Sequence, residues 1–314
     1  MKSTRTITIS LLLPLLLGCS GSFALPMMAA QLEAPTTIQS FPVGDNPAYL
    51  ALEGENIWVT NIDDNTVTKL RASDGTTLGT FPVGDTPFGI LFDGSSIWIV
   101  NSLDDTVSKL RPSDGAILGT FNAGAFPLYA TFDGANIWVG SGSEDAVTKL
   151  RASDGALLGT FPAGGISYGI AFDGANIWTA NIFASTVTKL RASDGVIVGT
   201  FPVSQEPDFM LFDGANIWVT SLRPSVVTKF RASDGALLGE FPVGSAPQGL
   251  AFDGKSIWVS NTRADTVMTL SRGGQIKHTF RVEDGPTGIL FDGTAIWVAN
   301  QGSNTVAKIT RRAP

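Results

Sequence analysis

The chain repeats itself at an interval of 40 residues over most of its length. All seven tryptophans keep this interval, and only the last arrives one residue early: Trp58, Trp98, Trp138, Trp178, Trp218, Trp258 and Trp297. Seven phenylalanines share the spacing, at Phe41, Phe81, Phe121, Phe161, Phe201, Phe241 and Phe280. A regular repeat of this length is typical of arrays in which each unit buries its apolar surface against the next. It predicts one domain of seven copies, although 314 residues alone would allow two.

Each copy contains short apolar or β-branched runs, separated by turn signals and without helical periodicity. In the second copy these runs are residues 88–92, 97–101, 106–112 and 116–123, and Asp93-Gly94 and Ser113-Asp114-Gly115 mark hairpin turns between them. Four antiparallel strands in about 40 residues form a propeller blade. The predicted fold class is therefore all-β, a seven-bladed β-propeller with four antiparallel strands per blade. Because an indole buries a large surface, we expect the tryptophans in the core between blades.

The two ends of the repeat region predict how the ring closes. The seventh copy stops after Ile309, Thr310 and Arg311, at the end of its third strand, whereas residues 37–43 form an unpaired fourth strand before the first copy. An open ring would leave strand edges exposed. We therefore expect a 3+1 closure, in which the N-terminal strand completes the last blade beside residues 305–310.

The repeated motifs carry a family resemblance. Each copy cycles through Pro-x-Gly, Phe-Asp-Gly, Ile-Trp-Val-x-Asn and Thr-Val-x-Lys-Leu, with Trp-Val-Thr-Asn at positions 58–61. This cycle resembles the YVTN family of β-propeller repeats and covers residues 37–312. The resemblance implies architecture more than function, since such propellers serve as binding platforms, as surface-layer components and, in the distantly similar streptogramin lyases, as enzymes.

The N-terminus predicts export. Lys2 and Arg5 precede an apolar run over residues 7–17, which is typical of a signal peptide. Leu16-Leu17-Gly18-Cys19 resembles the lipobox of bacterial lipoproteins, in which the cysteine is lipidated. We expect a signal peptide over residues 1–18, a tether over 19–36 and the propeller over 37–314, with a periplasmic or outer-surface location and membrane contact only through the lipid anchor. Cleavage at residue 24, after Ser22-Phe23-Ala24, is the alternative and would give a freely secreted protein.

Composition excludes several function classes. The net charge is −7, and removing Lys2 and Arg5 with the signal peptide would change it to −9, so nucleic acid is not an expected partner. Cys19 is the only cysteine and His278 the only histidine. An intrachain disulfide, a thiolate metal cluster and a zinc site of several histidines are therefore excluded.

Comparison of the copies separates two faces of the predicted ring. The bottom face carries the hairpin turns, and these hardly vary: Phe-Asp-Gly recurs in six copies and Ser-Asp-Gly in five. The top face carries the loops between second and third strands and the connections between blades, and these vary widely. Because folding alone gives no reason to diversify one face, we interpret the top as the working surface.

Candidate contacts can be named on this face. The connections into the innermost strands carry all three tyrosines and several other large or polar side chains. We predict ligand or partner contacts by Tyr49, Phe88, Tyr129, Tyr168, Asp208, Phe209, Gln248, Arg223 and Arg263. The partner would be a protein, a glycan or a small ligand, and the chain a monomer. The alternative is that the loops are only solvated and the aromatic residues pack the channel.

Other repeated or variable positions suggest that charge is distributed unevenly over the top face and that polar side chains hold the loops in place. Acidic residues lie in the first three copies, at Asp63, Asp64, Asp104, Asp105, Glu144 and Asp145, whereas Phe183, Arg223 and Arg263 lie in the next three. Asn61 and its equivalents end the second strand, where we expect side-chain bonds to loop backbone. Lys69 and Arg71, with their equivalents, are expected to form exposed ion pairs near the bottom.

Two enzyme classes remain as alternatives to a non-enzymatic binding platform. The resemblance implies that a streptogramin lyase uses a histidine base, acidic residues and a divalent ion at the top centre, but His278 falls in an outer fourth strand. A gluconolactonase-type hydrolase would hold calcium there. Candidate ligands for Ca²⁺ are Glu206, Asp208, Glu283 and Asp284. We predict no catalytic residue and no obligatory cofactor.

Overall fold

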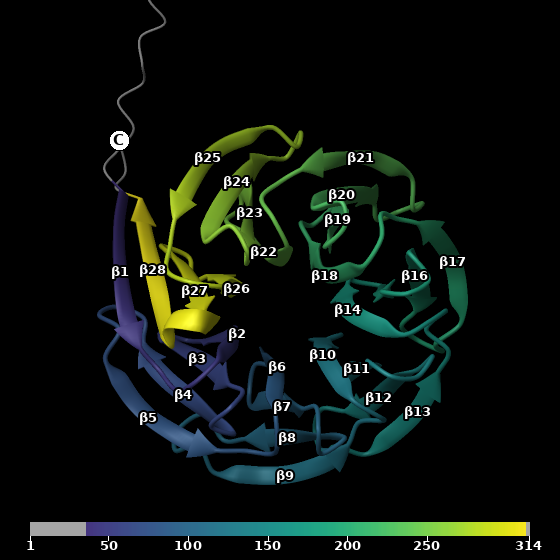
Figure 1. Ribbon diagram of the computed structural model, residues 1–314. Coiled ribbons are helices and arrows are strands. Elements are labelled where there is room, and N and C mark those ends of the chain that lie inside the picture. Colours follow the sequence, from purple (N-terminus) through teal and green to yellow (C-terminus); the bar gives the residue numbers. More distant parts are fainter. Residues whose placement is uncertain (1–35, 312–314) are drawn as a thin grey trace, which may run out of the picture. The chain divides into compact units, whose positions relative to one another are not determined.

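The computed structural model describes residues 36–311, which form a ring of seven four-stranded antiparallel sheets (Figure 1). The predicted seven-bladed propeller is confirmed. Each blade runs from its innermost strand outward. Blades 1 to 4 comprise β2 (Pro47–Glu53), β3 (Asn56–Asn61), β4 (Thr66–Arg71) and β5 (Thr77–Pro82); β6 (Pro87–Phe92), β7 (Ile97–Asn101), β8 (Thr106–Leu110) and β9 (Ile117–Asn122); β10 (Pro127–Phe132), β11 (Asn136–Ser141), β12 (Val147–Arg151) and β13 (Leu157–Phe161); and β14 (Ser167–Phe172), β15 (Asn176–Asn181), β16 (Thr186–Arg191) and β17 (Ile197–Pro202).

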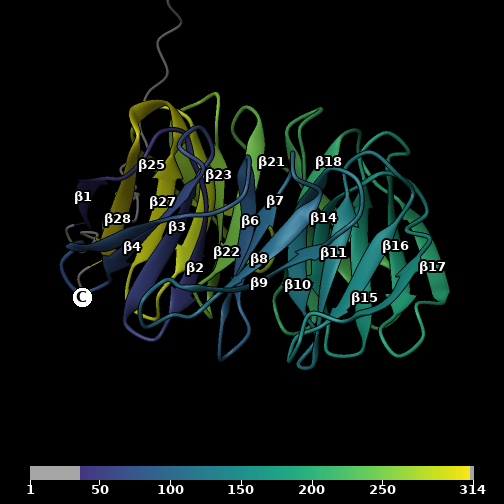
Figure 2. The same ribbon diagram turned by 90° about the horizontal axis from the view of Figure 1, so that it is seen from below.

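The remaining blades follow the same order. Blades 5 and 6 comprise β18 (Pro207–Phe212), β19 (Asn216–Ser221), β20 (Val226–Arg231) and β21 (Leu237–Pro242), then β22 (Pro247–Phe252), β23 (Ser256–Asn261), β24 (Thr266–Ser271) and β25 (Ile276–Arg281). Blade 7 comprises β26 (Pro286–Phe291), β27 (Ile296–Asn300), a short 3-10 helix η1 (Gln301–Ser303), β28 (Thr305–Arg311) and β1 (Thr36–Pro42). Seen from the side, loops project from both faces of the ring (Figure 2).

Closure joins the two ends of the repeat region. β1 pairs antiparallel with β28 from Thr36 opposite Arg311 to Pro42 opposite Thr305, and it becomes the outermost strand of blade 7 (Figure 1). The predicted 3+1 arrangement is confirmed. The expected signal peptide, the lipidation of Cys19 and nearly all of the tether lie outside the described residues, so those predictions stay open. No helix within residues 36–311 is long and apolar enough to cross a membrane.

The tryptophans fill the core between neighbouring blades, as predicted; Trp98 of blade 2, for example, packs in one cluster with Ile137 and Val139 of blade 3. Each is at most 2% exposed, and each packs against the phenylalanine at or one residue before the end of the outermost strand of its blade, as Trp98 does with Phe121 at 5.7 Å between ring centroids. A buried indole N–H needs an acceptor. The aspartate of the Phe-Asp-Gly turn supplies it, because Trp98 Nε1 donates to Asp93 Oδ2 at 2.7 Å, and all other blades repeat the bond, with Glu53 accepting in blade 1.

The repeated lysines connect neighbouring blades, and the expectation that they form exposed ion pairs was wrong about the exposure. Lys69 pairs with Glu53 at 3.2 Å and Lys189 with Asp173 at 3.9 Å, but both lysines are buried. Lys189 is 8% exposed, lies 5.0 Å above the Trp178 ring and donates from Nζ to the carbonyl oxygen of Ala232 in the next blade at 2.6 Å. Equivalent bonds start from Lys69, Lys109, Lys149, Lys229 and Lys308. The arginines do form the expected exposed pairs, such as Arg191 with Asp194 at 2.8 Å.

Contacts between blades explain why the bottom turns hardly vary. Gly115 in the Ser-Asp-Gly turn of blade 2 has φ +71°, and a Cβ there would overlap the ring of Phe81 in blade 1. Only glycine combines that backbone conformation with so close an approach. The carbonyl oxygen of Pro112 lies in the same turn and accepts the hydrogen bond from Lys69 of the preceding blade. The turn is therefore an inter-blade joint.

Candidate functional site

The acidic residues of the top loops are largely structural. Asp105 Oδ1 accepts a hydrogen bond from the backbone N–H of Phe126 at 2.7 Å, and Asp145 Oδ1 accepts from Gly165 at 2.9 Å, so each carboxylate links its blade to the next. Asn65 and Asp265 occupy the same repeat position and make the same kind of bond. Where the ring closes, Asn304 of blade 7 accepts the equivalent hydrogen bond from the backbone N–H of Asn46, which leads into blade 1. Part of the predicted acidic arc thus holds the ring together.

The repeated asparagines have a structural role, but the expected partner was wrong. Asn61 is buried, and its Nδ2 donates to the hydroxyls of Thr66 at 3.0 Å and Thr68 at 2.9 Å. Asn101 and Asn181 repeat this pattern. The bonds reach threonine and serine hydroxyls on the third strand instead of loop backbone. Only the serine equivalents, such as Ser141 bonded to the carbonyl of Ala125 at 2.6 Å, bond to backbone.

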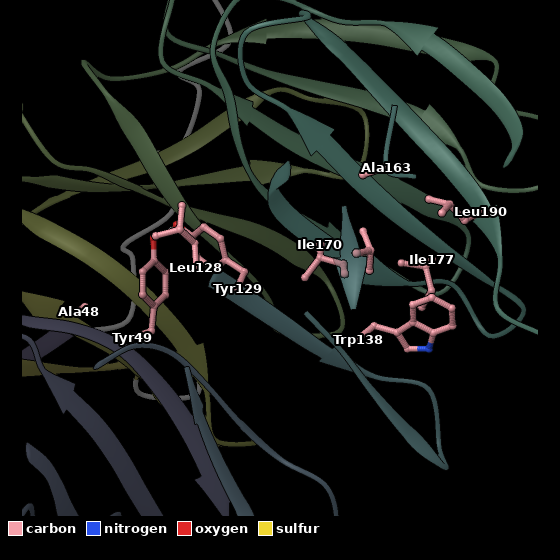
Figure 3. Close-up of a cluster of buried hydrophobic side chains, with 10 residues drawn as sticks. Ala48, Tyr49, Leu128, Tyr129, Trp138, Ala163, Ile170, Ile177 and Leu190 are labelled. Atoms are coloured by element: carbon pink, nitrogen blue, oxygen red, sulfur yellow. The ribbon is translucent and has the colours of Figure 1, made fainter. Parts of the chain in front are cut away.

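Aromatic side chains meet inside the channel instead of surrounding an open mouth. The Tyr49 ring stacks on Phe209 at 5.7 Å and meets the Tyr129 ring edge-on at 5.0 Å, although the three residues come from blades 1, 5 and 3. Phe88 contacts both tyrosines. Tyr49 and Tyr129 are buried, and their hydroxyls are hydrogen-bonded to each other (Figure 3). These residues form the channel cluster, which is held by contacts across the ring.

A carboxyl group is buried beside this cluster. Asp208 is 5% exposed, and Tyr129 Oη donates to its Oδ1 at 3.4 Å. Burial raises the pKa of Asp208 from 3.8 to about 7, and the Tyr129 hydrogen bond opposes the rise only in part. Burial and the nearby Asp208 charge also raise the pKa values of Tyr49 and Tyr129 well above 10. Burial therefore favours the neutral forms of Asp208, Tyr49 and Tyr129, because each ionised form would lose its hydration there.

The glycines at the same repeat position show how the cluster is accommodated. Tyr49, Tyr129 and Phe209 alternate around the ring with smaller residues, and Gly89 takes this position in blade 2. A Cβ on Gly89 would lie 2.6 Å from the carbonyl oxygen of Leu128 on the next innermost strand. Neighbouring strands therefore approach closely at the glycine, while the large rings of the other blades fill the channel.

The carboxylates proposed for calcium do not converge. Asp208 lies beside the channel cluster, Glu206 pairs with Arg223 at 3.2 Å, and the Thr305 hydroxyl donates to Glu283. Asp284 lines a separate cavity over blades 6 and 7. Within residues 36–311, no group of three or more histidine, cysteine, aspartate or glutamate side chains is placed to hold a metal ion.

The exposed tips of the second-to-third strand loops differ sharply between blades. In blades 4, 5 and 6 the tips are Phe183, Arg223 and Arg263, and all three are exposed, Phe183 to 74%. Blade 2 exposes Leu103 at this position, and blade 7 has Gly302. We refer to Phe183, Arg223 and Arg263 as the tip arc.

Of the residues predicted for ligand contact, the structure brings only a subset to one exposed place. Arg223, Arg263 and Gln248 line one cavity of about 360 Å³ between the top loops of blades 5 and 6. Phe88, Tyr168 and Phe209 are partly exposed near the channel, whereas Tyr49, Tyr129 and Asp208 are reached only if the cluster opens. Sequence reasoning missed Leu222, Ser245 and Thr262, which line the cavity. The only sequence signal for these three residues was that they differ from the residues at the same positions of other copies.

Comparison with known proteins identifies the fold and no family. The chain matches no protein-family model and no curated protein. A streptogramin B lyase structure aligns with a TM-score of 0.77 and 17% identity, covering 88% of this chain and 98% of that one. A catalytically inactive virginiamycin B lyase from Staphylococcus aureus with quinupristin aligns with a TM-score of 0.76 and 16% identity, covering 88% of this chain and 100% of that one. A Kuenenia stuttgartiensis hydrazine synthase aligns with a TM-score of 0.76 and 17% identity, covering 85% of this chain and 96% of that one.

At such identities the likeness concerns fold alone. It confirms the distant similarity to streptogramin lyase propellers, while the YVTN assignment stays a prediction. The fold is compatible with a binding platform and with a lyase-like enzyme.

Proposed function

We propose that this chain is an exported, non-enzymatic binding platform whose top face over blades 4 to 6 captures a ligand or partner. The observation that carries the proposal is the contrast among residues at one repeat position. At the tip of this loop blades 1, 3 and 7 carry Asp63, Ser143 and Gly302, and blade 2 carries the exposed Leu103. The tip arc instead presents the exposed Phe183 and two exposed arginines, Arg223 and Arg263, that line a cavity. Exposed aromatic and arginine side chains are enriched where proteins bind partners.

The enzyme alternative has weaker support at the top centre. The aromatic rings of the channel cluster contact one another where the resemblance would place a substrate. His278 lies on β25, the outermost strand of blade 6, and a general base must reach the proton it removes. Calcium titration separates the two functions, because a rise in Tm with calcium that disappears in Asp208→Ala would favour the hydrolase.

The platform is tested by crosslinking in the native cell envelope. A variant with Phe183→Ser, Arg223→Ser and Arg263→Ser should lose the crosslinked partner and keep the Tm of the parent chain. The matched control is Arg151→Ser with Arg191→Ser, which removes two arginines paired with bottom-turn aspartates. Equal capture by the parent, the tip-arc variant and the control would contradict the proposal.

A further inference from the structure

The cavity between blades 5 and 6 is built by loops that differ from the repeat. Glu206 precedes β18, Arg223 lies between β19 and β20, Ser245 precedes β22, and Arg263 lies between β23 and β24. Its volume of about 360 Å³ lies near the lower end of the roughly 300–1,000 Å³ that small-molecule sites occupy. The space therefore suits a compact ligand.

The charges around the cavity favour an anion. Two arginines face one glutamate, and Arg223 Nε already pairs with Glu206 Oε2 at 3.2 Å. Arg263 is exposed and makes no ion pair with any residue of the described range. A guanidinium without a carboxylate partner binds a ligand carboxylate or phosphate through paired N–H donors. This cation excess is local, since the whole chain has a net charge of −7.

A second cavity adjoins Arg263 on its other side and has the opposite balance. It lies over blades 6 and 7 and is lined by Arg263 together with Asp265 and Asp284. Two carboxylates against one guanidinium repel an anion. The anion is therefore expected on the blade 5 side of Arg263.

The remaining lining groups suit a hydroxylated ligand. The single proton of the Thr262 hydroxyl is shared between Gln248 Oε1, at 3.0 Å, and the carbonyl oxygen of Pro286, at 2.7 Å. The NH₂ group of Gln248 carries two N–H donors, so at least one of them is available to a ligand. Ser245 is exposed and adds a hydroxyl, while Leu222 adds an apolar wall. Donors for a carboxylate, polar partners for hydroxyls and an apolar surface for a ring together match a sugar acid.

We propose that this cavity binds a hydroxylated organic anion of monosaccharide size, of the uronate type, through Arg263, Gln248 and Ser245. The inference deepens the proposed function, because it assigns a ligand class to the same top face. The uronate would be either a free sugar acid or the terminal residue of a glycan. Both sources present the same carboxylate and ring hydroxyls.

Calorimetric titration of the purified chain with glucuronate at low ionic strength tests the site. We expect saturable binding with a Kd of about 1 mM or tighter, and no saturable binding of glucose. Arg263→Gln should weaken binding at least about 10-fold, the loss expected for one charge-assisted pair. Glu206→Gln should strengthen it, because the competing carboxylate disappears. Arg231→Gln, which removes a bottom-face arginine paired with Asp234, should leave it unchanged.

Three results would overturn the inference. They are the absence of saturable glucuronate binding, an Arg263→Gln variant of unchanged affinity, and displacement of glucuronate by inorganic phosphate or sulfate at equal concentration, which would leave only a simple anion site. A glucuronate-terminated trisaccharide supports the site if it binds through Arg263, and tighter binding than free glucuronate identifies a glycan as the source. Envelope capture through the tip arc without glucuronate binding would overturn the ligand class and leave the platform standing.

Discussion

The buried carboxyl of Asp208 makes a prediction about stability that the structure allows to be worked out in detail. The perturbation is Asp208→Asn, which keeps the size of the side chain and removes its ability to ionise. Asp208 is 5% exposed and lies beside Tyr129 in the channel cluster. An amide at this position can still accept the Tyr129 hydroxyl, so the variant should keep the cluster intact.

The magnitude follows from the pKa values of the two states. The pKa of Asp208 is about 7 in the folded protein and 3.8 when it is exposed. Between these values the folded protein holds a proton that the unfolded chain has released, so the free energy of unfolding falls as pH rises. The contribution is fully present below pH 3.8 and is lost by about pH 7. A difference of about 3 pKa units corresponds to about 4 kcal/mol.

The assay is the Tm of parent and variant measured from pH 4 to pH 8. Because 1 kcal/mol shifts the Tm of a domain as large as this ring by just under about 2 °C, we expect the Tm of the variant to rise by about 7 °C relative to the parent across this range. The Asp133→Asn variant is the control, because the pKa of Asp133 is shifted in the opposite direction. Burial alone would raise the pKa of Asp133, but hydrogen bonds from Asn136, Trp138 and backbone outweigh it and hold the pKa below its ordinary value.

Replacing Asp133 should therefore cost a nearly constant amount of stability from pH 4 to pH 8, because the contribution of its ionised form is present above pH 3.8 and is lost only at lower pH. Parallel Tm curves for the parent and Asp208→Asn would refute the reasoning. They would show that the Asp208 carboxyl is hydrated or that its proton is held equally in both states.

Further predictions concern the joints between blades. Lys189→Met should lower the free energy of unfolding by about 1–3 kcal/mol, because it removes a charged hydrogen bond, a cation–π contact and the ion pair with Asp173. Urea titration measures the loss against the exposed Lys255→Met control, and equal losses for the two variants would show that Lys189 is unimportant. Gly195→Ala should cost clearly more than Gly174→Ala in the same titration, since both have positive φ but only the first meets a ring, that of Phe161. Equal costs would show that backbone strain alone matters. Deleting residues 36–42 should lower Tm sharply by removing β1 from blade 7, and an unchanged melting curve would exclude a closing role.

The sequence predicted the scaffold well because the scaffold is what the repeat encodes. Strand boundaries of the second blade, the burial of the tryptophans and the pairing of β1 with β28 all follow from features that recur every 40 residues. Turn chemistry and apolar patterning are local, so each copy confirms the others.

The contacts across and between blades were not predictable in the same way. Tyr49 and Phe209 are 160 positions apart and meet only because the ring is narrow enough for their side chains to touch. Lys189 has the composition of a surface residue, and its partner is a backbone carbonyl 43 positions away. Every residue carries a backbone carbonyl, so the sequence does not show which residue accepts the hydrogen bond of the lysine. The cavity beside Arg263 likewise depends on how two loops from neighbouring blades lie in space.

The most direct test of the account places a photo-crosslinking amino acid at position 183 in the tip arc and, in a second variant, at position 118 on the outermost strand of blade 2. Phe183 and Leu118 are both exposed apolar residues, so the two probes are chemically matched. After irradiation in the native envelope, the account predicts a discrete crosslinked partner from position 183 and none from position 118. The same products from both positions, or a partner from position 118 alone, would contradict the claim that the top face of blades 4 to 6 is the binding surface.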